Sequence, residues 1–527
     1  MQEPRSTARP ESGAGGFLIR TSTAYNPGDE VGAVDGTTRR PRRWGCELII
    51  EDSNQEGRRG STDEPPLLRR RTVLLAAAVP VFTTFACSRT DGTTADRAAG
   101  DPPVAIEAAT EGPDLRPFPP AVEPLVRIKV ANTTRRTVEL GRVGQSLWIT
   151  SPESGNAGRA VRGPVRIIRD DRGWSVRWSR AGRGSSARFP GPGSLAITAR
   201  GASEEGIDFE GRRLEGTIRV VPIRNTEGSP ELDLVCTLPM EAYLPGVLEK
   251  ELFGSWRPAT FEAQAVAARS FAVCERAFWM RRRHYDLVAG QASQAWSGGA
   301  ASTRSRNAVE TTAGRVLLWR GQVVPAYYSA ACGGRPADAI DAISTNRVNG
   351  IPPLVVAAGT PRRRCGCTTS SPHADWRISI EEDAMLRALH AHGRRISDRK
   401  LASLEGPIEV AVRRRNASGR PIDFEIGGKN DAVPAVVTAS RLRSVVAEAG
   451  GRRSWKDGPR SASFELESTP DGFRILGQGY GHGVGLCQYG AESMARRGAS
   501  SLEILAHYYP GATVGVSWEG DRRGGFG

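Results

Sequence analysis

The sequence predicts an α+β protein with a β-rich N-terminal part and a following core that mixes helices and strands. Short runs in which apolar and polar residues alternate fill residues 124–237, as expected for half-buried strands. Two long runs with helical periodicity follow between residues 240 and 277. Helical and strand-like segments then mix up to residue 515, without the fixed repeat of a solenoid. We therefore expect an α+β region over residues 124–515.

The first 123 residues precede this region. Residues 1–66 are rich in Gly, Pro, Ser, Thr, Arg and Glu and show no period, which indicates a disordered extension or a mis-called start. Residues 67–87 contain three arginines, an apolar run and a small residue before Cys87, the pattern of a lipoprotein signal segment. A buried core helix is the alternative for that run. Residues 88–123 are rich in Pro, Ala, Gly and Asp and predict a linker.

Each further element is expected from its period and its flanking turn residues. In the β-rich part the strand-like runs are 125–131, 146–150, 165–168, 174–178, 216–222 and 232–236. Two helices follow at 240–252 and 258–277, the second with Pro258 in its first turn. The later elements are strands at 315–319, 323–328, 407–413, 422–427 and 462–467 and helices near 381–392, 438–448 and 500–508. Residues 516–527 are expected to form a flexible tail.

The formal net charge of +14 raises the question of a nucleic-acid partner. Only five of the 72 basic residues are lysines, and arginine takes their place even in loops and tails. That distribution is typical of a coding bias rather than of a surface built to bind phosphates. The chain also lacks the dinucleotide fingerprint, the P-loop and the HExxH and GxSxG motifs. Nucleic acid is therefore not an expected partner, while polyanions of a cell envelope stay open.

Eight cysteines occur, and export would allow some of them to form disulfides. Cys332 and the Cys365-x-Cys367 pair lie in loops that contain glycine, where a bridge is easier to arrange. One disulfide from Cys332 to Cys365 or Cys367 is the preferred interpretation. A zinc site formed by these three cysteines with His373 is the alternative, although its spacing matches no standard zinc knuckle.

Two charged clusters stand out in the helical part. Residues 249–251, Glu-Lys-Glu, lie near Trp256, and an exposed helix end that only meets water is the plain alternative there. Arg269 is the only charged residue of the apolar stretch 263–274. Because an unpaired buried charge is costly, Arg269 must reach solvent or meet an acid.

A third cluster is the glycine-rich stretch 477–490, in which His482 stands between two glycines. Glycine lets the backbone approach a ligand closely, and an imidazole hydrogen-bonds or transfers a proton near neutral pH. A flexible loop with an idle histidine is the alternative.

Read together, four stretches resemble the motifs of the SpoIID/LytB family, the stage II sporulation protein D type of peptidoglycan-cleaving or amidase-enhancing proteins. In order, they are Leu238–Leu252, Glu262–Phe271, Tyr327–Arg335 and Gly479–Gly490, and Tyr508–Gly511 closes the pattern. The resemblance extends over residues 124–515 and implies a SpoIID-type fold with a catalytic core at 238–515.

The resemblance implies a lytic transglycosylase that cuts the β-1,4 bond between N-acetylmuramic acid and N-acetylglucosamine. Glu251 falls on the family's catalytic glutamate. An acid there needs a raised pKa, and the apolar neighbours Leu252, Phe253 and Trp256 would favour one by desolvation. The family positions expected to bind the sugar chain are Arg269, Tyr328, Ser329, Asp341, His482 and Gln488.

The implied partners are peptidoglycan glycan strands, and the rival function is non-catalytic activation of a partner N-acetylmuramoyl-L-alanine amidase. An acid at position 251 favours the enzyme over the activator. No cofactor or metal is expected: some family members carry a metal-ligating His-Cys segment after the long helix, and residues 292–298 here contain neither residue type. Lipidation of Cys87 would make the chain an exported, membrane-anchored lipoprotein that faces the cell wall.

Overall fold

The computed structural model describes residues 116–154, 158–180, 182–201, 206–225, 228–299, 301–356, 365–428, 433–451 and 458–519. These residues form ten α-helices and several β-sheets, which confirms the predicted α+β class. Among them, no helix is long and apolar enough to cross a membrane. The predicted lipid site Cys87 lies outside the described residues, as do the predicted segments 1–66 and 67–87 and most of the linker.

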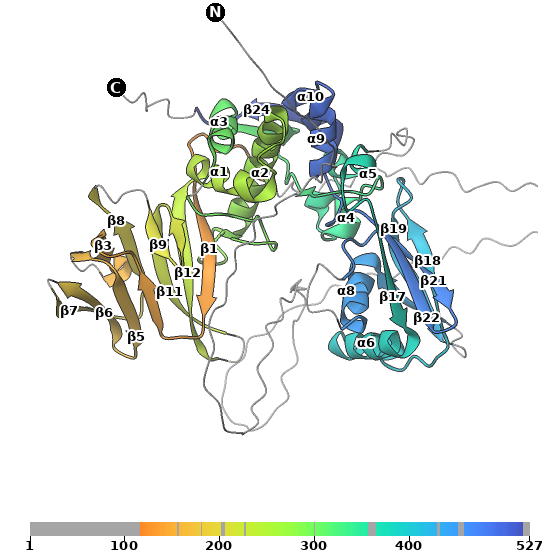
Figure 1. Ribbon diagram of the computed structural model, residues 1–527, viewed down its shortest axis with the longest axis horizontal. Helices are drawn as coiled ribbons and strands as arrows, with labels where there is room; N and C mark the ends of the chain where they lie inside the picture. The colour runs from red at the N-terminus through yellow and green to blue at the C-terminus, as the bar shows by residue number, and fades with distance from the viewer. Residues whose placement is uncertain are drawn as a thin grey trace, which may run out of the picture. The chain divides into compact units, whose positions relative to one another are not determined.

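Two larger sheets of the β-rich part share one hydrophobic core. The seven-stranded sheet has the order β13-β1-β12-β11-β8-β3-β4, and the four-stranded sheet has the order β2-β5-β6-β7 (Figure 1). The strands are β1 (Leu125–Thr133), β2 (Thr137–Leu140), β3 (Ser146–Thr150), β4 (Arg159–Arg162), β5 (Val165–Asp170), β6 (Gly173–Arg180), β7 (Arg183–Pro190), β8 (Leu195–Ala199), β11 (Thr217–Arg224), β12 (Pro230–Pro239) and β13 (Leu287–Val288), with a separate pair β9 (Ile207–Phe209) and β10 (Arg212–Leu214). Val126, Ile128 and Val130 of β1 are buried at every second position, which is the alternation seen in the sequence.

Two helices follow directly after β12, as predicted. Helix α1 spans Met240–Glu251 and helix α2 spans Pro258–Trp279. Pro258 begins α2, where the backbone N–H that proline lacks would have no partner within the helix. Glu492, far along the chain, accepts a hydrogen bond from the Thr260 hydroxyl at 2.9 Å. The start of α2 is therefore tied to a later helix, α9 (Gln488–Arg496).

Around α2 the chain builds a second core from short elements. They are α3 (Thr303–Thr311), β14 (Arg315–Trp319), β15 (Gln322–Val323), β16 (Tyr328–Ser329), α4 (Ala339–Ala342), α5 (Cys367–Ser370), β23 (Leu486–Cys487), α9 (Gln488–Arg496), α10 (Ser501–Tyr508) and β24 (Thr513–Val516), with 3-10 turns at Arg347–Asn349 and Pro352–Leu354. Strand β16 pairs in parallel with β23, so the motif around Tyr328 lies beside the glycine-rich motif. The single strand expected at 323–328 is split, because Pro325 cannot donate to a ladder.

A third core unites two three-stranded sheets with the helices that pack on them. The sheets have the orders β17-β22-β21 and β18-β19-β20 (Figure 1). The elements are β17 (Asp375–Glu381), α6 (Glu382–Arg395), α7 (Arg399–Ala402), β18 (Ile408–Arg415), β19 (Pro421–Gly428), β20 (Ala435–Thr438), α8 (Ala439–Ala449), β21 (Phe464–Thr469) and β22 (Gly472–Gln478). Strand β22 leads directly into the glycine-rich stretch, so this core holds one end of that stretch in place.

Candidate functional site

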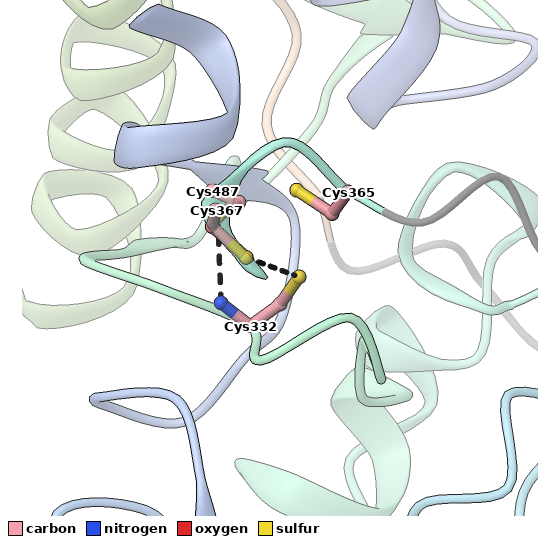
Figure 2. Close-up of side chains that lie close together, drawn as sticks. All are labelled: Cys332, Cys365, Cys367 and Cys487. Atoms are coloured by element: carbon pink, nitrogen blue, oxygen red, sulfur yellow. Dashed lines mark hydrogen bonds between the residues drawn. The ribbon is translucent and has the colours of Figure 1, made fainter. Parts of the chain in front are cut away.

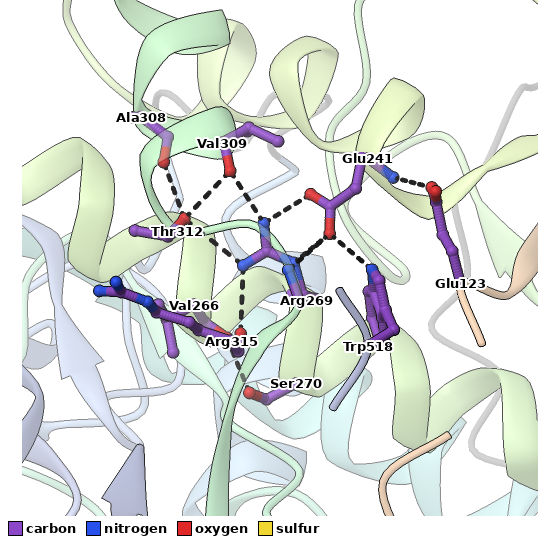
Figure 3. Close-up of polar contacts among 11 residues, drawn as sticks. Glu123, Glu241, Val266, Arg269, Ser270, Ala308, Val309, Thr312, Arg315 and Trp518 are labelled. Carbon is purple, nitrogen blue, oxygen red and sulfur yellow. Dashed lines mark hydrogen bonds and ion pairs between the residues drawn. The ribbon is translucent and has the colours of Figure 1, made fainter. Parts of the chain in front are cut away.

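The three glutamates of α1 lie in three different environments, and Glu241 belongs to a buried ion pair (Figure 3). Arg269 of α2 donates to its carboxylate from Nη2 at 2.7 Å and from Nε at 3.0 Å, and Gly314 N and the Trp518 indole N–H donate to the same group. The Arg269 side chain is 0% exposed, and its Nη1 donates to the carbonyl oxygen of Arg315 at 3.1 Å.

Arg269 therefore meets an acid, as the cost of a buried charge requires. A side chain without exposed surface has no contact to offer a sugar in this conformation. In this structure Arg269 instead joins α1, α2 and the first residue of β14, and the expectation that it binds substrate stays a prediction.

Glu249 is exposed, and its carboxylate contacts the start of a neighbouring helix. It accepts hydrogen bonds from the backbone N–H of Ser302 at 2.9 Å and from the Ser305 hydroxyl at 3.0 Å. Partial burial alone would raise the pKa of Glu249, but these hydrogen bonds and the charge of Arg306 outweigh it, and the pKa lies below its ordinary value. Glu249 is thus an ionised contact to α3 rather than a proton donor.

Glu251, the last residue of α1, has the surroundings of a general acid. Its Oε1 accepts from the backbone N–H of Ala295 at 3.0 Å, and its Oε2 accepts from the Gln488 side chain at 3.1 Å. Burial raises the pKa of Glu251 above its ordinary value, and the two hydrogen bonds offset only part of that rise. One donor at each oxygen fixes the carboxyl, while desolvation favours its protonated form.

Gln294 links two tyrosines beside Glu251. Its amide oxygen accepts from the Tyr243 hydroxyl at 3.1 Å, and its amide nitrogen donates to the Tyr328 hydroxyl oxygen at 2.9 Å. Burial and the negative charge of Glu251 raise the pKa of both tyrosines well above the usual value, so both stay protonated. No sequence motif singles out Gln294. Its signal is its near-complete burial, at 1% exposed, which is visible only in the structure.

The segment that supplies Ala295 is held against α1 by its own backbone and side chains. The Trp296 indole N–H donates to the carbonyl oxygen of Tyr243 at 3.1 Å, and Ser297 N donates to the carbonyl oxygen of Gly246 at 3.1 Å. A Cβ on Gly246 would lie 2.6 Å from the Trp296 indole nitrogen, so glycine permits this close approach.

The glycine-rich stretch adopts a backbone that favours glycine at alternate positions. From Gly479 to Gly485 every second residue is a glycine with positive φ: 79°, 94°, 80° and 66°. At Gly485 a Cβ would also collide with the carbonyl oxygen of Tyr327. The stretch therefore follows a defined path that glycine adopts without strain and that other residues would not.

His482 contacts the backbone of Tyr328 instead of carrying a mobile proton. Its Nδ1 accepts from the backbone N–H of Val484 at 3.0 Å, and the ring also hydrogen-bonds the Tyr328 backbone. Burial and the nearby charge of Arg420 lower the pKa of His482 to about 4. His482 is neutral near pH 7, and its ring links the backbone of Val484 to that of Tyr328.

The structure brings most of the expected site residues together. Tyr328 and Gln488 adjoin Glu251. The hydroxyl of the buried Ser329, next to Tyr328 in β16, accepts a hydrogen bond from the backbone N–H of Gly483 at 3.2 Å. Asp341 differs: it is exposed on α4 and lines a hollow with Asn416 and Arg420 among others, and no described contact connects it with Glu251.

Three aromatic rings pack together next to Glu251. Phe253 lies 5.2 Å from Trp256 and 6.1 Å from Tyr489 between ring centroids, and Trp256 lies 5.1 Å from Tyr489. The Phe253 side chain is 55% exposed and Trp256 only 6%, so the Phe253 ring presents an apolar face to solvent. Such faces bind the C–H surfaces of sugar rings, while polar groups beside them set orientation.

The cysteines assemble differently from either sequence interpretation. Cys332, Cys365 and Cys367 meet, but Cys487 joins them in place of His373, whose Nδ1 lies 3.1 Å from Arg460 Nη1. The Cys332 and Cys367 sulfurs are 3.6 Å apart, beyond the length of an S–S bond, and the described cysteines are free, so a bridge from Cys332 to Cys365 or Cys367 stays a prediction.

Comparisons with known proteins agree on one family. Residues 229–319 match the family model described as SpoIID, Stage II sporulation protein. An uncharacterized protein of Brachyspira hyodysenteriae is 25% identical over 332 residues, covering 61% of this chain and 79% of that protein. Stage II sporulation protein D of Bacillus amyloliquefaciens is 25% identical over 325 residues, covering 58% of this chain and 82% of that protein.

A third relative carries a different name. The protein named amidase enhancer of Bacillus subtilis is 24% identical over 300 residues, covering 51% of this chain but only 40% of that longer protein. The matched segment 229–319 contains α1, α2 and Glu251, which are the elements that build the site. On the family match over residues 229–319 and these relatives, this chain is similar to the SpoIID family of stage II sporulation proteins.

Proposed function

We propose that this chain acts on the cell wall and cleaves peptidoglycan glycan strands by lytic transglycosylation. The observation that carries the proposal is the Glu251 carboxyl, which has a raised pKa and is held at both oxygens by Ala295 and Gln488. Its neighbours on α1 are committed elsewhere, Glu241 to Arg269 and Glu249 to the start of α3. Glu251 is thus the glutamate of α1 best placed to donate a proton.

One carboxyl suffices for this reaction. Protonated Glu251 gives its proton to the glycosidic oxygen as the bond from that oxygen to C1 of the muramic residue breaks. The resulting carboxylate takes the proton of the muramic 6-hydroxyl, whose oxygen then bonds to C1. The product is a 1,6-anhydro sugar, Glu251 regains its proton, and neither an attacking water nor a second carboxylate is needed, unlike ordinary glycoside hydrolysis.

The surroundings of Glu251 fit a sugar substrate. The exposed Phe253 ring, which packs on the buried Trp256 and on Tyr489, offers an apolar surface for a sugar ring. Because Gln294 donates to the Tyr328 hydroxyl oxygen, the Tyr328 O–H stays available to donate to a further acceptor, such as a sugar oxygen. In this proposal both features bind and orient the glycan, and Glu251 performs the chemistry.

A second function rests on the relative named amidase enhancer. In that case the chain would bind peptidoglycan and stimulate a partner N-acetylmuramoyl-L-alanine amidase. The hydrogen bonds of Glu251 would then only connect α1, α9 and the segment around Ala295. Either function places the folded part at the cell wall, outside the cytoplasmic membrane, and lipidation of Cys87 would anchor it there.

Product analysis separates the two functions. The purified chain is incubated with isolated peptidoglycan, and released fragments are identified by mass spectrometry after borohydride treatment. Transglycosylation predicts fragments with an anhydro end, which borohydride does not reduce. If the chain alone releases none but accelerates release of stem peptides by an added amidase, the enhancer function replaces the enzyme.

A further inference from the structure

The four described cysteines nearest the site come from three separate parts of the chain. Cys332 follows β16, Cys365 and Cys367 lie at the start of α5, and Cys487 ends β23. All four sulfur atoms lie within 4.8 Å of one another. In Figure 2 the sulfurs of Cys332, Cys365 and Cys367 turn toward the space that they share. Three loops thus deliver four thiols to one point.

The spacing of these sulfurs matches a metal site better than a disulfide. Four thiolates at about 2.3 Å from a zinc ion in a tetrahedron would lie about 3.8 Å from one another. The Cys332 and Cys367 sulfurs are 3.6 Å apart. A disulfide would need about 2.05 Å and could join only two of the four.

Groups around the cluster suit bound thiolates. The backbone N–H of Cys332 donates to the Cys487 sulfur at 3.4 Å, and the Tyr508 hydroxyl lies 3.4 Å from the Cys365 sulfur (Figure 2 draws the first). Hydrogen bonds of this kind orient metal ligands and stabilise their negative charge. At Gly490 a Cβ would collide with the Tyr508 oxygen and the Cys365 sulfur, so glycine leaves room for the cluster.

We propose that Cys332, Cys365, Cys367 and Cys487 bind one zinc ion as a structural site. Four cysteine ligands in a tetrahedron are typical of structural zinc, because no position is left for water or substrate. The cluster is nearly closed to solvent: Cys332, Cys367 and Cys487 are 3%, 0% and 1% exposed. The site differs from the His-Cys segment of some family members, whose counterpart here, residues 292–298, holds neither residue type.

The zinc ion would hold together the chain segments that supply the candidate active site. Cys487 immediately precedes Gln488, the donor to Glu251. Cys332 follows Ala331, which exchanges backbone hydrogen bonds with Tyr480 at 2.7 and 3.1 Å. Zinc therefore joins the loop after β16 to the start of α9 and fixes the direction of Gln488. This consequence rests on the proposed function, whereas zinc binding itself does not.

The test measures metal, not activity. The full chain is produced under reducing conditions, freed of loosely bound ions and analysed for metals by mass spectrometry. One zinc per chain is expected, with the four thiols protected from alkylation until a strong chelator is added. A chain that takes up no zinc after reconstitution, that pairs these cysteines in disulfides, or that holds iron instead would overturn the proposal.

Variants make the assignment specific. Cys367→Ser should lower the affinity of the chain for zinc at least tenfold. Cys274→Ser, which lies outside the cluster, should still bind one zinc ion per chain. Should Cys367→Ser fail to fold, cobalt replaces zinc in the unaltered chain. Tetrahedral thiolate bands in its spectrum support the site, and their absence rejects it. Glu251→Gln should retain one zinc even if it is inactive, which separates failure of the zinc site from failure of the proposed function.

Discussion

Replacing Arg269 by methionine would show whether this residue holds the core together or binds substrate. The side chain is 0% exposed, and its partner Glu241 is 19% exposed. Breaking such a buried pair by removing one partner costs about 3–5 kcal/mol, because the other charge is left without compensation. We expect the low end of that range, since Gly314 N and the Trp518 indole would still donate to Glu241.

The assay is urea unfolding at neutral pH, followed by tryptophan fluorescence, for Arg269→Met, Glu241→Gln and the double variant. The double variant should lose clearly less free energy of unfolding than the sum of the single losses, because no lone charge remains. Arg395→Met is the control: its pair with Glu448 is 48% and 40% exposed and should contribute less than about 1 kcal/mol. If Arg269→Met unfolds like the unaltered chain but binds glycan poorly, the structural role is refuted.

Four further outcomes are expected. Gly485→Ala should lower the melting temperature, because its φ of +66° and the Tyr327 carbonyl oxygen both exclude a Cβ; an unchanged temperature would contradict that backbone. The pKa of His482 is about 4 in the folded state against 6.5 for an ordinary histidine, so the free energy of unfolding should fall as pH drops from 6.5 toward 4. His482→Asn should make that fall shallower, and an equally steep fall in the variant would contradict the assignment to His482. Activity should decline as pH rises through the raised pKa of Glu251, because the acid form is lost, and a flat profile would argue against this acid. Cys87→Ala should release the chain from the membrane fraction if Cys87 is lipidated, and unchanged association would point to another anchor.

Long elements with a clear period were predictable from sequence. The strand 146–150 has the predicted bounds, and α1 and α2 agree with the predicted helices within two residues. Short or polar elements were not. Helix α9 begins inside a glycine-rich stretch, and α3 contains few apolar residues. Neither carries a sequence signal strong enough to predict a helix, and both depend on their tertiary contacts.

Site residues could be predicted from the sequence only where they belong to a motif or carry a charge in an apolar segment. The motifs pointed to Glu251, Tyr328 and Gln488, and the structure brings these three together. That Arg269 must reach solvent or meet an acid followed from the cost of a buried charge, but which of the two holds, and that the acid is Glu241, depends on how α1 packs on α2.

Residues that meet only through folding escaped prediction. Gln294 matters because both of its amide ends meet tyrosines from other elements. Cys487 joins the other three cysteines through the parallel pairing of β16 with β23, a long-range contact that spacing along the chain does not encode.

The central claim is that Glu251 is the acid and base of glycan cleavage. The most direct measurement compares the rate of anhydro-product release by the unaltered chain, Glu251→Gln and the matched variant Glu249→Gln. Both substitutions are nearly isosteric, and both sites lie at the end of α1. We predict that Glu251→Gln loses at least about a hundredfold in rate while still folding and binding glycan, and that Glu249→Gln is nearly unchanged. A fully active Glu251→Gln variant beside an inactive Glu249→Gln variant would contradict this assignment.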